Sequence, residues 1–265
     1  MTEAALRITT FLTVLLAMIA WEYFAAARPV ARPIWRRRLV NLAFALLGTV
    51  CVRVVMPASL ASAAYLSGLY GIGLFRLVPV PAVASWIATV LVLDLAVYLQ
   101  HRAFHRWPLF WRLHAVHHAD AALDVTTGVR FHPVEILVSL AWKSSVVVLL
   151  GAPAGAAVLF ELILSITALV THANVRLPSV AEKWARYIVV TPTLHRIHHS
   201  IVPDERDRNY GFSLSCWDRL FATYRASARQ SDQDLQVGLP SVSASRARSL
   251  AEMLLLPLRL TVARR

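Results

Sequence analysis

HRAFHRWPLFWRLHAVHH, residues 101–118, holds five of the ten histidines of this chain. LHRIHHS, residues 194–200, holds three more in nearly the same pattern. Residues three or four apart share one face of a helix, so each cluster is expected to present two or three imidazoles to one point in space. Neutral imidazole binds iron, zinc, copper and nickel, and eight such ligands exceed what one ion can use. The spacing therefore predicts a site for two metal ions.

The other two histidines, His132 and His172, stand alone in the sequence. A lone buried histidine is often a hydrogen-bonded core residue, so a structural role and a ligand role weigh about equally at these positions. The clusters are different. Their repeated helical spacing is not the pattern of an incidental histidine run.

The composition is that of an integral membrane protein. Hydrophobic residues make up 57% and charged residues 16% of the 265 positions, and the mean hydropathy is +0.56. The net charge of +12 comes almost wholly from arginine, because Lys143 and Lys183 are the only lysines. The arginines flank apolar runs and no nucleic-acid motif is present, so anionic lipid headgroups are a better partner than nucleic acid. Cys51 and Cys216 are too few for a disulfide scaffold, a zinc ribbon or an iron–sulfur cluster.

Several segments are apolar enough to lie in a bilayer. The loop Arg28 to Arg38 carries five arginines and no acid, which assigns it to the cytoplasm and the amino terminus to the outside. Counting crossings from that loop puts every histidine at the cytoplasmic edge. Residues 59–81, with glycine-flanked bends, suit an external or re-entrant segment. The expected membrane segments are 8–27, 39–58, 82–100 and a hairpin of 134–151 and 154–171 that turns at Gly151-Ala-Pro153.

Other metal chemistries fit the histidines less well. Zinc hydrolases typically carry HExxH, which is missing from this sequence, and soluble dimetal oxygenases bridge their irons with glutamates that the clusters lack. Paired haem ligands would need wider spacing. A metal transporter would place ligands near the bilayer midplane, whereas these clusters fall at one edge. A structural metalloprotein or receptor domain remains the third alternative, to be separated by an assay of lipid oxidation.

With RFHPVE (130–135), THANV (171–175) and NYGFSLSCWDRLFATY (209–224), the clusters resemble the fatty acid hydroxylase superfamily, which includes sterol desaturases, sterol methyl oxidases, alkylglycerol monooxygenase and carotenoid hydroxylases. The resemblance implies a dinuclear non-haem iron centre that uses dioxygen and two electrons to hydroxylate or desaturate a lipid, such as a sterol or a fatty acyl chain. It implies iron ligands at His101, His105, His114, His117, His118, His195, His198 and His199, with His132 and His172 in the places of further family histidines.

The resemblance also divides the chain. It covers about residues 85–225, the expected catalytic domain of an all-α, polytopic membrane protein with a cytoplasmic, histidine-rich cap. Residues 1–84 are expected to be amino-terminal membrane helices. Residues 226–265 are expected to form a mobile linker up to 247 and then a short interfacial helix over 248–263, since Pro257 argues against another full span.

The electron source is expected to be a separate protein. A fused cytochrome b5 module would show a His-Pro-Gly-Gly loop, whereas the only His-Pro, at His132, continues Val-Glu. The arginine-rich, lysine-poor composition is typical of a GC-rich bacterial genome and hence favours the bacterial inner membrane. The substrate is not named by these residues.

Three acids and bases inside the apolar segments need partners. Asp94 shares one helical stripe with Tyr98, His101 and His105, and is expected to accept a hydrogen bond from an imidazole of another cluster; the alternative is a protonated Asp94 bonded to a neighbouring backbone. Lys143 and Glu161 lie at similar distances from the hairpin turn. They either pair at equal depth, or Lys143 snorkels and Glu161 is protonated.

Overall fold

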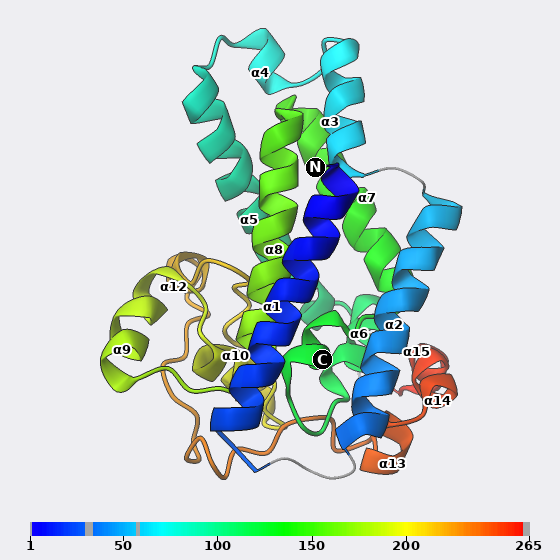
Figure 1. Ribbon diagram of the computed structural model, residues 1–265, viewed down its shortest axis with the longest axis vertical. Coiled ribbons are helices and arrows are strands. Elements are labelled where there is room, and N and C mark those ends of the chain that lie inside the picture. Colours follow the sequence, from blue (N-terminus) through cyan, green and yellow to red (C-terminus); the bar gives the residue numbers. More distant parts are fainter. Residues whose placement is uncertain (1, 30–33, 57–58, 262–265) are drawn as a thin grey trace.

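Five long apolar helices form the helical bundle of the molecule (Figure 1). The computed structural model describes residues 2–29, 34–56 and 59–261. Helices of 18 to 25 residues are about 27 to 38 Å long, enough to cross a hydrocarbon core of about 30 Å. The second of the five apolar segments that are long enough to cross a membrane begins with α2 and extends to Leu77. The long helices are α1 (Glu3–Ala25), α2 (Ile34–Val55), α5 (Ala82–Arg106), α7 (Pro133–Leu150) and α8 (Ala154–His172).

This arrangement confirms the prediction of an all-α, multi-pass membrane protein, and in the described residues the only β-structure is two isolated bridges. The outer faces of the long helices expose large apolar side chains such as Leu46, Val83 and Leu149. Inside the bundle, Leu93 of α5, Leu140 of α7 and Phe160 of α8 pack against one another. Apolar residues thus cover both the inside and the lipid-facing outside, which is how a membrane helix differs from an amphipathic soluble one.

The expected hairpin of α7 and α8 is present and turns where predicted. Gly151 ends α7 in the left-handed conformation, at φ 67°, and Pro153 precedes the first residue of α8. α3 (Leu60–Leu69) and α4 (Leu74–Leu77) cover this turn at the end of the bundle far from the cap (Figure 1). A Cβ atom at Gly73 would lie 2.1 Å from the backbone nitrogen of Gly151, so the two chains touch at glycine.

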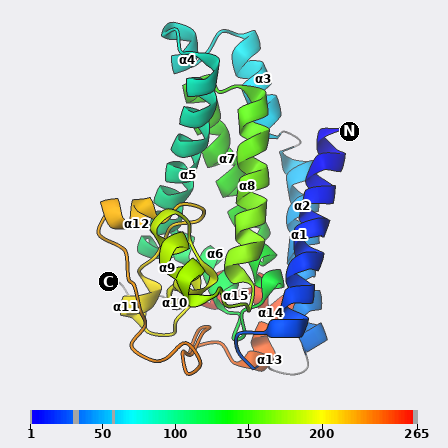
Figure 2. The same ribbon diagram turned by 60° about the vertical axis from the view of Figure 1, so that its left-hand side comes forward.

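All the short elements after α5 gather at the opposite end, which we call the cap (Figures 1 and 2). In the cap, Val116 of α6 packs with Phe44 of α2 and with Met253 and Leu256 near the carboxyl terminus. The cap elements are α6 (Pro108–His118), the 3-10 helix η1 (Val125–Val129), α9 (Ser179–Ile188), α10 (Pro192–His198), α11 (Pro203–Arg206), α12 (Cys216–Leu220), α13 (Ala244–Ala247), α14 (Leu250–Leu254) and α15 (Leu256–Arg259).

Residues 226–247 are not the mobile linker that we predicted. Leu235 is 2% exposed, and Leu239 and Val242 are buried. Val237 forms a bridge with Ser200. The predicted carboxyl-terminal helix is also interrupted, because α14 ends before Pro257 and α15 begins anew around it; residues 262 and 263 of that prediction lie outside the described residues. The segment therefore belongs to the cap and adds apolar side chains to its core.

Glu161 forms an ion pair, but not with Lys143. Its carboxylate contacts the guanidinium of Arg7 on α1, which also pairs with Glu3. Among the described residues no ion pair joins Lys143 to Glu161, so the first of the two alternatives, a direct pair, is not formed. The sequence argument compared only the two helices of the hairpin, whereas the structure packs α1 against α8.

Candidate metal centre

Nine of the ten histidines meet where the cap joins the bundle, at the ends of four helices. None of the nine is more than 7% exposed. Pro108 at the first turn of α6 prevents α5 from continuing, because proline lacks the backbone N–H that a helix interior requires, so the chain turns back and brings the histidines of α6 to those of α5. The nine are His101 and His105 of α5, His114, His117 and His118 of α6, His172 of α8, and His195, His198 and His199 at α10.

The nine histidines form two groups. Within each group, one nitrogen per ring can be chosen so that all lie within 4.8 Å of one another. The two groups are adjacent, since the rings of His118 and His199 stack with centroids 4.4 Å apart. The first group is His101, His105, His114, His118 and His198, and the second group is His117, His172, His195 and His199.

The groups do not follow the sequence clusters. We predicted that each cluster would point its imidazoles at one place, but His117 joins the second group while its neighbours His114 and His118 join the first. Successive residues on a helix differ in direction by about 100°, so the adjacent His117 and His118 face different groups. His195 and His198, three residues apart, are also divided, whereas pairs four residues apart, such as His195 and His199, stay in one group.

The spacing of the inward nitrogens suits metal coordination. Two ligand nitrogens about 2.1 Å from one ion and at a right angle lie about 3 Å apart. The Nε2 atoms of His101 and His114 are 3.1 Å apart, and Nε2 of His172 lies 3.0 Å from that of His117 and 2.9 Å from that of His195. The rings are therefore already close to the separation that a shared ion requires.

Some inward nitrogens have no hydrogen-bond partner. Buried polar atoms are rarely left without one, so each such atom needs an explanation. Nε2 of His105, His118 and His198 is buried and has no partner within the described structure. All three belong to the first group, and an ion coordinated there would satisfy them. On this donor set and on these unpaired atoms, the residues fit two metal ions.

Outer ring nitrogens hold several of the imidazoles in place, whereas Nδ1 of His118, His195 and His199 is buried without a hydrogen-bond partner within the described structure. Nδ1 of His101 lies 2.8 Å from the carbonyl of Tyr210, and Nδ1 of His198 lies 2.8 Å from that of Arg208. In the second group, Nδ1 of His172 lies 2.6 Å from the carbonyl of Ala168. An Nδ1–H that donates to a carbonyl leaves Nε2 as the free base, which is the form that binds a metal.

The imidazoles are neutral at physiological pH. Burial lowers the pKa of His114 to about 3, because the charged form loses its water. Burial also lowers the pKa of His117, His118, His195 and His198 well below the ordinary value, with smaller contributions from neighbouring histidines. Protons therefore do not compete with a metal for these nitrogens near pH 7.

His132 and Asp94 lie apart from both groups. Nδ1 of His132 accepts the backbone N–H of Val134, which caps α7, and its Nε2 lies 3.3 Å from the carbonyl of Leu254. Both ring nitrogens are thus occupied, and the structure supports the alternative of a structural histidine.

Asp94 accepts hydrogen bonds from the indole of Trp217 and the backbone of Leu214. None of its hydrogen bonds in the described structure involves a histidine. The expected hydrogen bond from an imidazole to Asp94 is therefore not formed. Its carboxylate instead connects α5 to α12 and to the loop before it. These segments fold over the face of α5 that we had expected a histidine cluster to cover.

Sequence reasoning missed the carboxylates that do contact histidines. Glu135 Oε1 lies 2.6 Å from Nδ1 of His114, and Asp207 Oδ1 lies 3.3 Å from Nδ1 of His105. Glu135 closes the quoted motif RFHPVE, so a signal was present, but nothing in the motif says which imidazole it would meet. Asp207 lies eight residues after His199, in a segment whose contacts depend on the fold of the cap.

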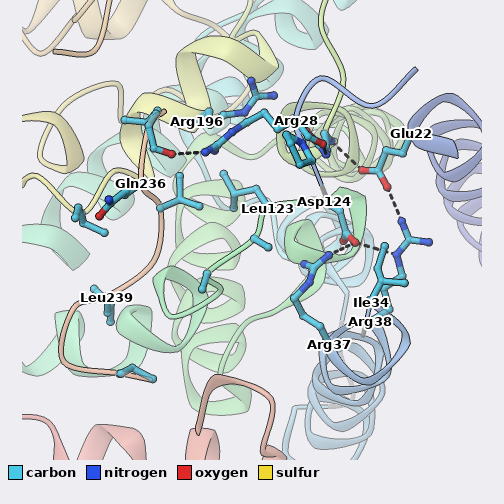
Figure 3. A pocket seen from close by; sticks show the side chains of 18 of the residues that line it. Glu22, Arg28, Ile34, Arg37, Arg38, Leu123, Asp124, Arg196, Gln236 and Leu239 are labelled. Atoms are coloured by element: carbon cyan, nitrogen blue, oxygen red, sulfur yellow. Dashed lines mark hydrogen bonds and ion pairs between the residues drawn. The ribbon is translucent and has the colours of Figure 1, made fainter. Parts of the chain in front are cut away.

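A buried polar network supports the centre from the side of α2. Arg37 pairs with Asp120 and Asp124, and Arg38 pairs with Asp124 and Glu22. Four of these residues, Glu22, Arg37, Arg38 and Asp124, line a cavity of about 480 Å³, shown in Figure 3. Its described lining residues include no histidine, so the cavity is separate from the metal centre.

Comparisons with known proteins agree with the geometry. The Fatty acid hydroxylase family matches residues 86–223, just over half of the chain. Over 157 residues the chain is 32% identical to ornithine lipid hydroxylase OlsE of Rhizobium tropici, covering 59% of this chain and 46% of that protein. It is 28% identical over 148 residues to alkylglycerol monooxygenase of Caenorhabditis elegans and 27% over 143 residues to the human enzyme, in each case covering 54% of this chain.

The matches span less than half the length of these relatives: 46% of OlsE, 27% of the nematode protein and 31% of the human one. No solved structure matches significantly. The family match covers all nine grouped histidines and the segments that hold their outer nitrogens. This chain belongs to the fatty acid hydroxylase family.

Proposed function

We propose that this protein is a membrane-bound di-iron oxygenase that hydroxylates or desaturates a lipid, using dioxygen and two electrons from a separate donor protein. One observation carries the proposal. Nine buried, neutral imidazoles stand in two groups at the end of a bundle of apolar helices, with unpaired nitrogens facing inward. Hydroxylation is favoured because the relatives are named hydroxylases and monooxygenases.

Iron is the metal that this proposal requires. Imidazole also binds zinc, copper and nickel, but zinc has no redox chemistry. When bound, the iron pair would supply the activation of dioxygen and the removal of hydrogen from an unactivated C–H bond, which no side chain can perform. The protein would hold the ions through the first group and the second group. Its own contribution is to keep the imidazoles neutral, to orient them through their outer nitrogens and to exclude water by burial.

A lipid is the substrate class that the position of the centre favours. The histidines lie where the membrane helices end, so a lipid could bring a chain carbon to them while its headgroup stays at the bilayer surface. The names of the relatives suggest ornithine lipids and alkylglycerols as the first candidates, followed by sterols, fatty acids and carotenoids. A metal transporter fits less well, since its ligands would lie near the middle of the bundle.

The test is turnover by the purified, iron-loaded protein. Protein prepared under reducing, iron-replete conditions should hold close to two irons per chain. Incubation with each lipid class, a chemical reductant and oxygen-18 gas should give a product with one labelled oxygen, or one new double bond. Two bound irons with no lipid product from any of these classes would contradict the oxygenase proposal and leave a structural or transport role. Recovered zinc would call for repeating the loading, because zinc stands above ferrous iron in affinity.

We also propose that the centre faces the cytoplasm of a bacterial inner membrane. The support is the arginine-rich loop Arg28 to Arg38, of which residues 30–33 lie outside the described structure, and the match to a Rhizobium protein. After Cys51 and Cys216 are replaced by alanine, a single cysteine in residues 226–247 should react with a permeant label only. A cysteine near the amino terminus should react with an impermeant one. Labelling of the 226–247 segment from outside would overturn this orientation.

A further inference from the structure

The two histidine groups differ in what backs their outer nitrogens. In the first group two imidazoles contact carboxylates, His114 at Glu135 and His105 at Asp207. In the second group the outer partners of His117 and His172 include the backbone carbonyls of Arg130 and Ala168. Within the described structure, no carboxylate hydrogen-bonds to any of its four histidines. The two proposed ion positions therefore face unequal surroundings.

Glu135 is the stronger of the two carboxylate contacts. It is 4% exposed, and its Oε1 lies 2.6 Å from Nδ1 of His114, a short hydrogen bond. Its second oxygen, Oε2, is buried and has no hydrogen-bond partner within the described residues. Asp207 is farther from its histidine, at 3.3 Å, has a side chain 21% exposed and also lies 3.7 Å from Arg206.

A buried carboxyl group is either protonated or has a positive charge nearby, because an unpaired carboxylate is strongly disfavoured. Among the described residues, no lysine or arginine forms an ion pair with Glu135. An ion on the inner nitrogen of His114 would supply that charge through the imidazole, which would then donate its Nδ1–H to Glu135. Carboxylates in this position raise the basicity of a ligating imidazole and fix its orientation, whereas a backbone carbonyl carries no net charge.

We propose that Glu135 is a positioning residue that makes the two ion positions unequal. Acting through His114, it strengthens the hold of the first group on its ion, so the first group fills before the second. Asp207 adds to the same position through His105, with a smaller effect. The inference rests on the proposed function in one respect, namely that the nine histidines hold two ions.

Stepwise metal binding tests this inference without any measurement of turnover. Metal-free full-length protein in detergent is titrated with cobalt(II) in the absence of oxygen, against a competing chelator, and the cobalt absorption bands are followed. Wild-type protein should show two binding steps of different affinity. Glu135→Gln keeps the shape and removes the charge, so the tighter step should weaken by about 10 to 100-fold while the other step stays unchanged. His195→Ala, which removes a ligand of the second group, should instead weaken the looser step.

Asp94→Asn is the matched control. Asp94 is a buried acid near the same end of the bundle, 2% exposed, but its hydrogen bonds go to Trp217 and Leu214. Both cobalt steps should match the wild type in this variant. Should Glu135→Gln fail to fold, Asp207→Asn replaces it and should weaken the tighter step by a smaller factor.

Equal weakening of both steps in Glu135→Gln, or no weakening of either, would overturn the role of Glu135. Weakening of the looser step alone would overturn the assignment to the first group. A single cobalt step in the wild type would overturn the two-ion centre on which the inference rests. The two failures can thus be told apart.

Discussion

The two ends of this molecule are stabilised by different interactions. In the cap, charged groups are buried and paired: Arg37 contacts Asp120 and Asp124, and the fully buried Arg130 donates to Asn41 and to two backbone carbonyls. At the far end, α3 and α4 pack apolar side chains and glycine against the hairpin of α7 and α8. Charge is sparse there.

The difference follows from what each end has to do. Membrane helices need only an apolar surface and close packing, because lipid solvates their outer faces. The cap must hold nine imidazoles at fixed positions, and apolar contacts are not directional enough for that. Hydrogen bonds and ion pairs fix both distance and angle. We therefore expect substitutions in the cap to have much larger effects than equivalent substitutions in the bundle.

The largest effect should come from a ligand of the first group. His198→Ala removes one inward nitrogen, so bound iron should fall and turnover should drop by more than about 100-fold, since loss of an outer partner alone costs about 10 to 100-fold. Metal analysis and the lipid assay measure both. The control is His132→Ala, which lies outside both groups and should keep its iron. Full iron and full turnover in His198→Ala would contradict the assignment of the centre.

A smaller but still large effect is expected at Arg37. Arg37→Met leaves Asp120 and Asp124 without this partner in a buried site, and breaking a buried ion pair typically costs about 3 to 5 kcal/mol. Thermal denaturation in detergent should show a clear loss of stability. Arg36→Met is the control, because Arg36 is exposed and stacks on Trp35. Similar melting of both variants would mean that the network does not stabilise the cap.

Acid should weaken the cap before it affects the bundle. The folded-state pKa of His114 is about 3, below the unfolded value near 6.5, so below pH 6.5 the unfolded state binds more protons. The stability that this histidine contributes is present above pH 6.5 and is lost as the pH falls, by about 1 kcal/mol per pH unit. Metal-free protein should therefore melt at lower temperature at pH 5.5 than at pH 7.5. A melting temperature that does not change over this range would contradict the neutral, buried imidazoles.

The smallest effect is expected at the charge pair of the bundle. Arg7 and Glu161 are partly exposed, with side chains 28% and 17% accessible, and Arg7 keeps Glu3 as a second partner. Glu161→Gln keeps a hydrogen-bond acceptor beside Arg7, which also keeps Glu3, so this variant should lose less stability than Arg37→Met. Thermal denaturation beside Arg37→Met gives the direct comparison. A loss as large as that of Arg37→Met would break the distinction between the two ends.

Local patterns predicted much of this protein because they depend on neighbours in the sequence. The apolar segments predicted the five long helices, and Gly151 and Pro153 predicted the position of the hairpin turn. The histidine clusters predicted eight of the nine grouped histidines, since residues three or four apart lie on the same side of a helix. The ninth, His172, was left open as either a ligand or a core residue, and the structure places it in the second group.

The sequence by itself determined the class of the protein and most of the grouped histidines, because composition and helical periodicity act over a few residues. Only the tertiary structure decided how the clusters mix into two groups, because helices from distant parts of the chain had to converge first. It also decided that Glu135 meets His114, that Asp94 meets Trp217 and that residues 226–247 pack on the cap. These contacts join residues 21 to 123 positions apart, and no local pattern encodes which partner a side chain finds at that distance.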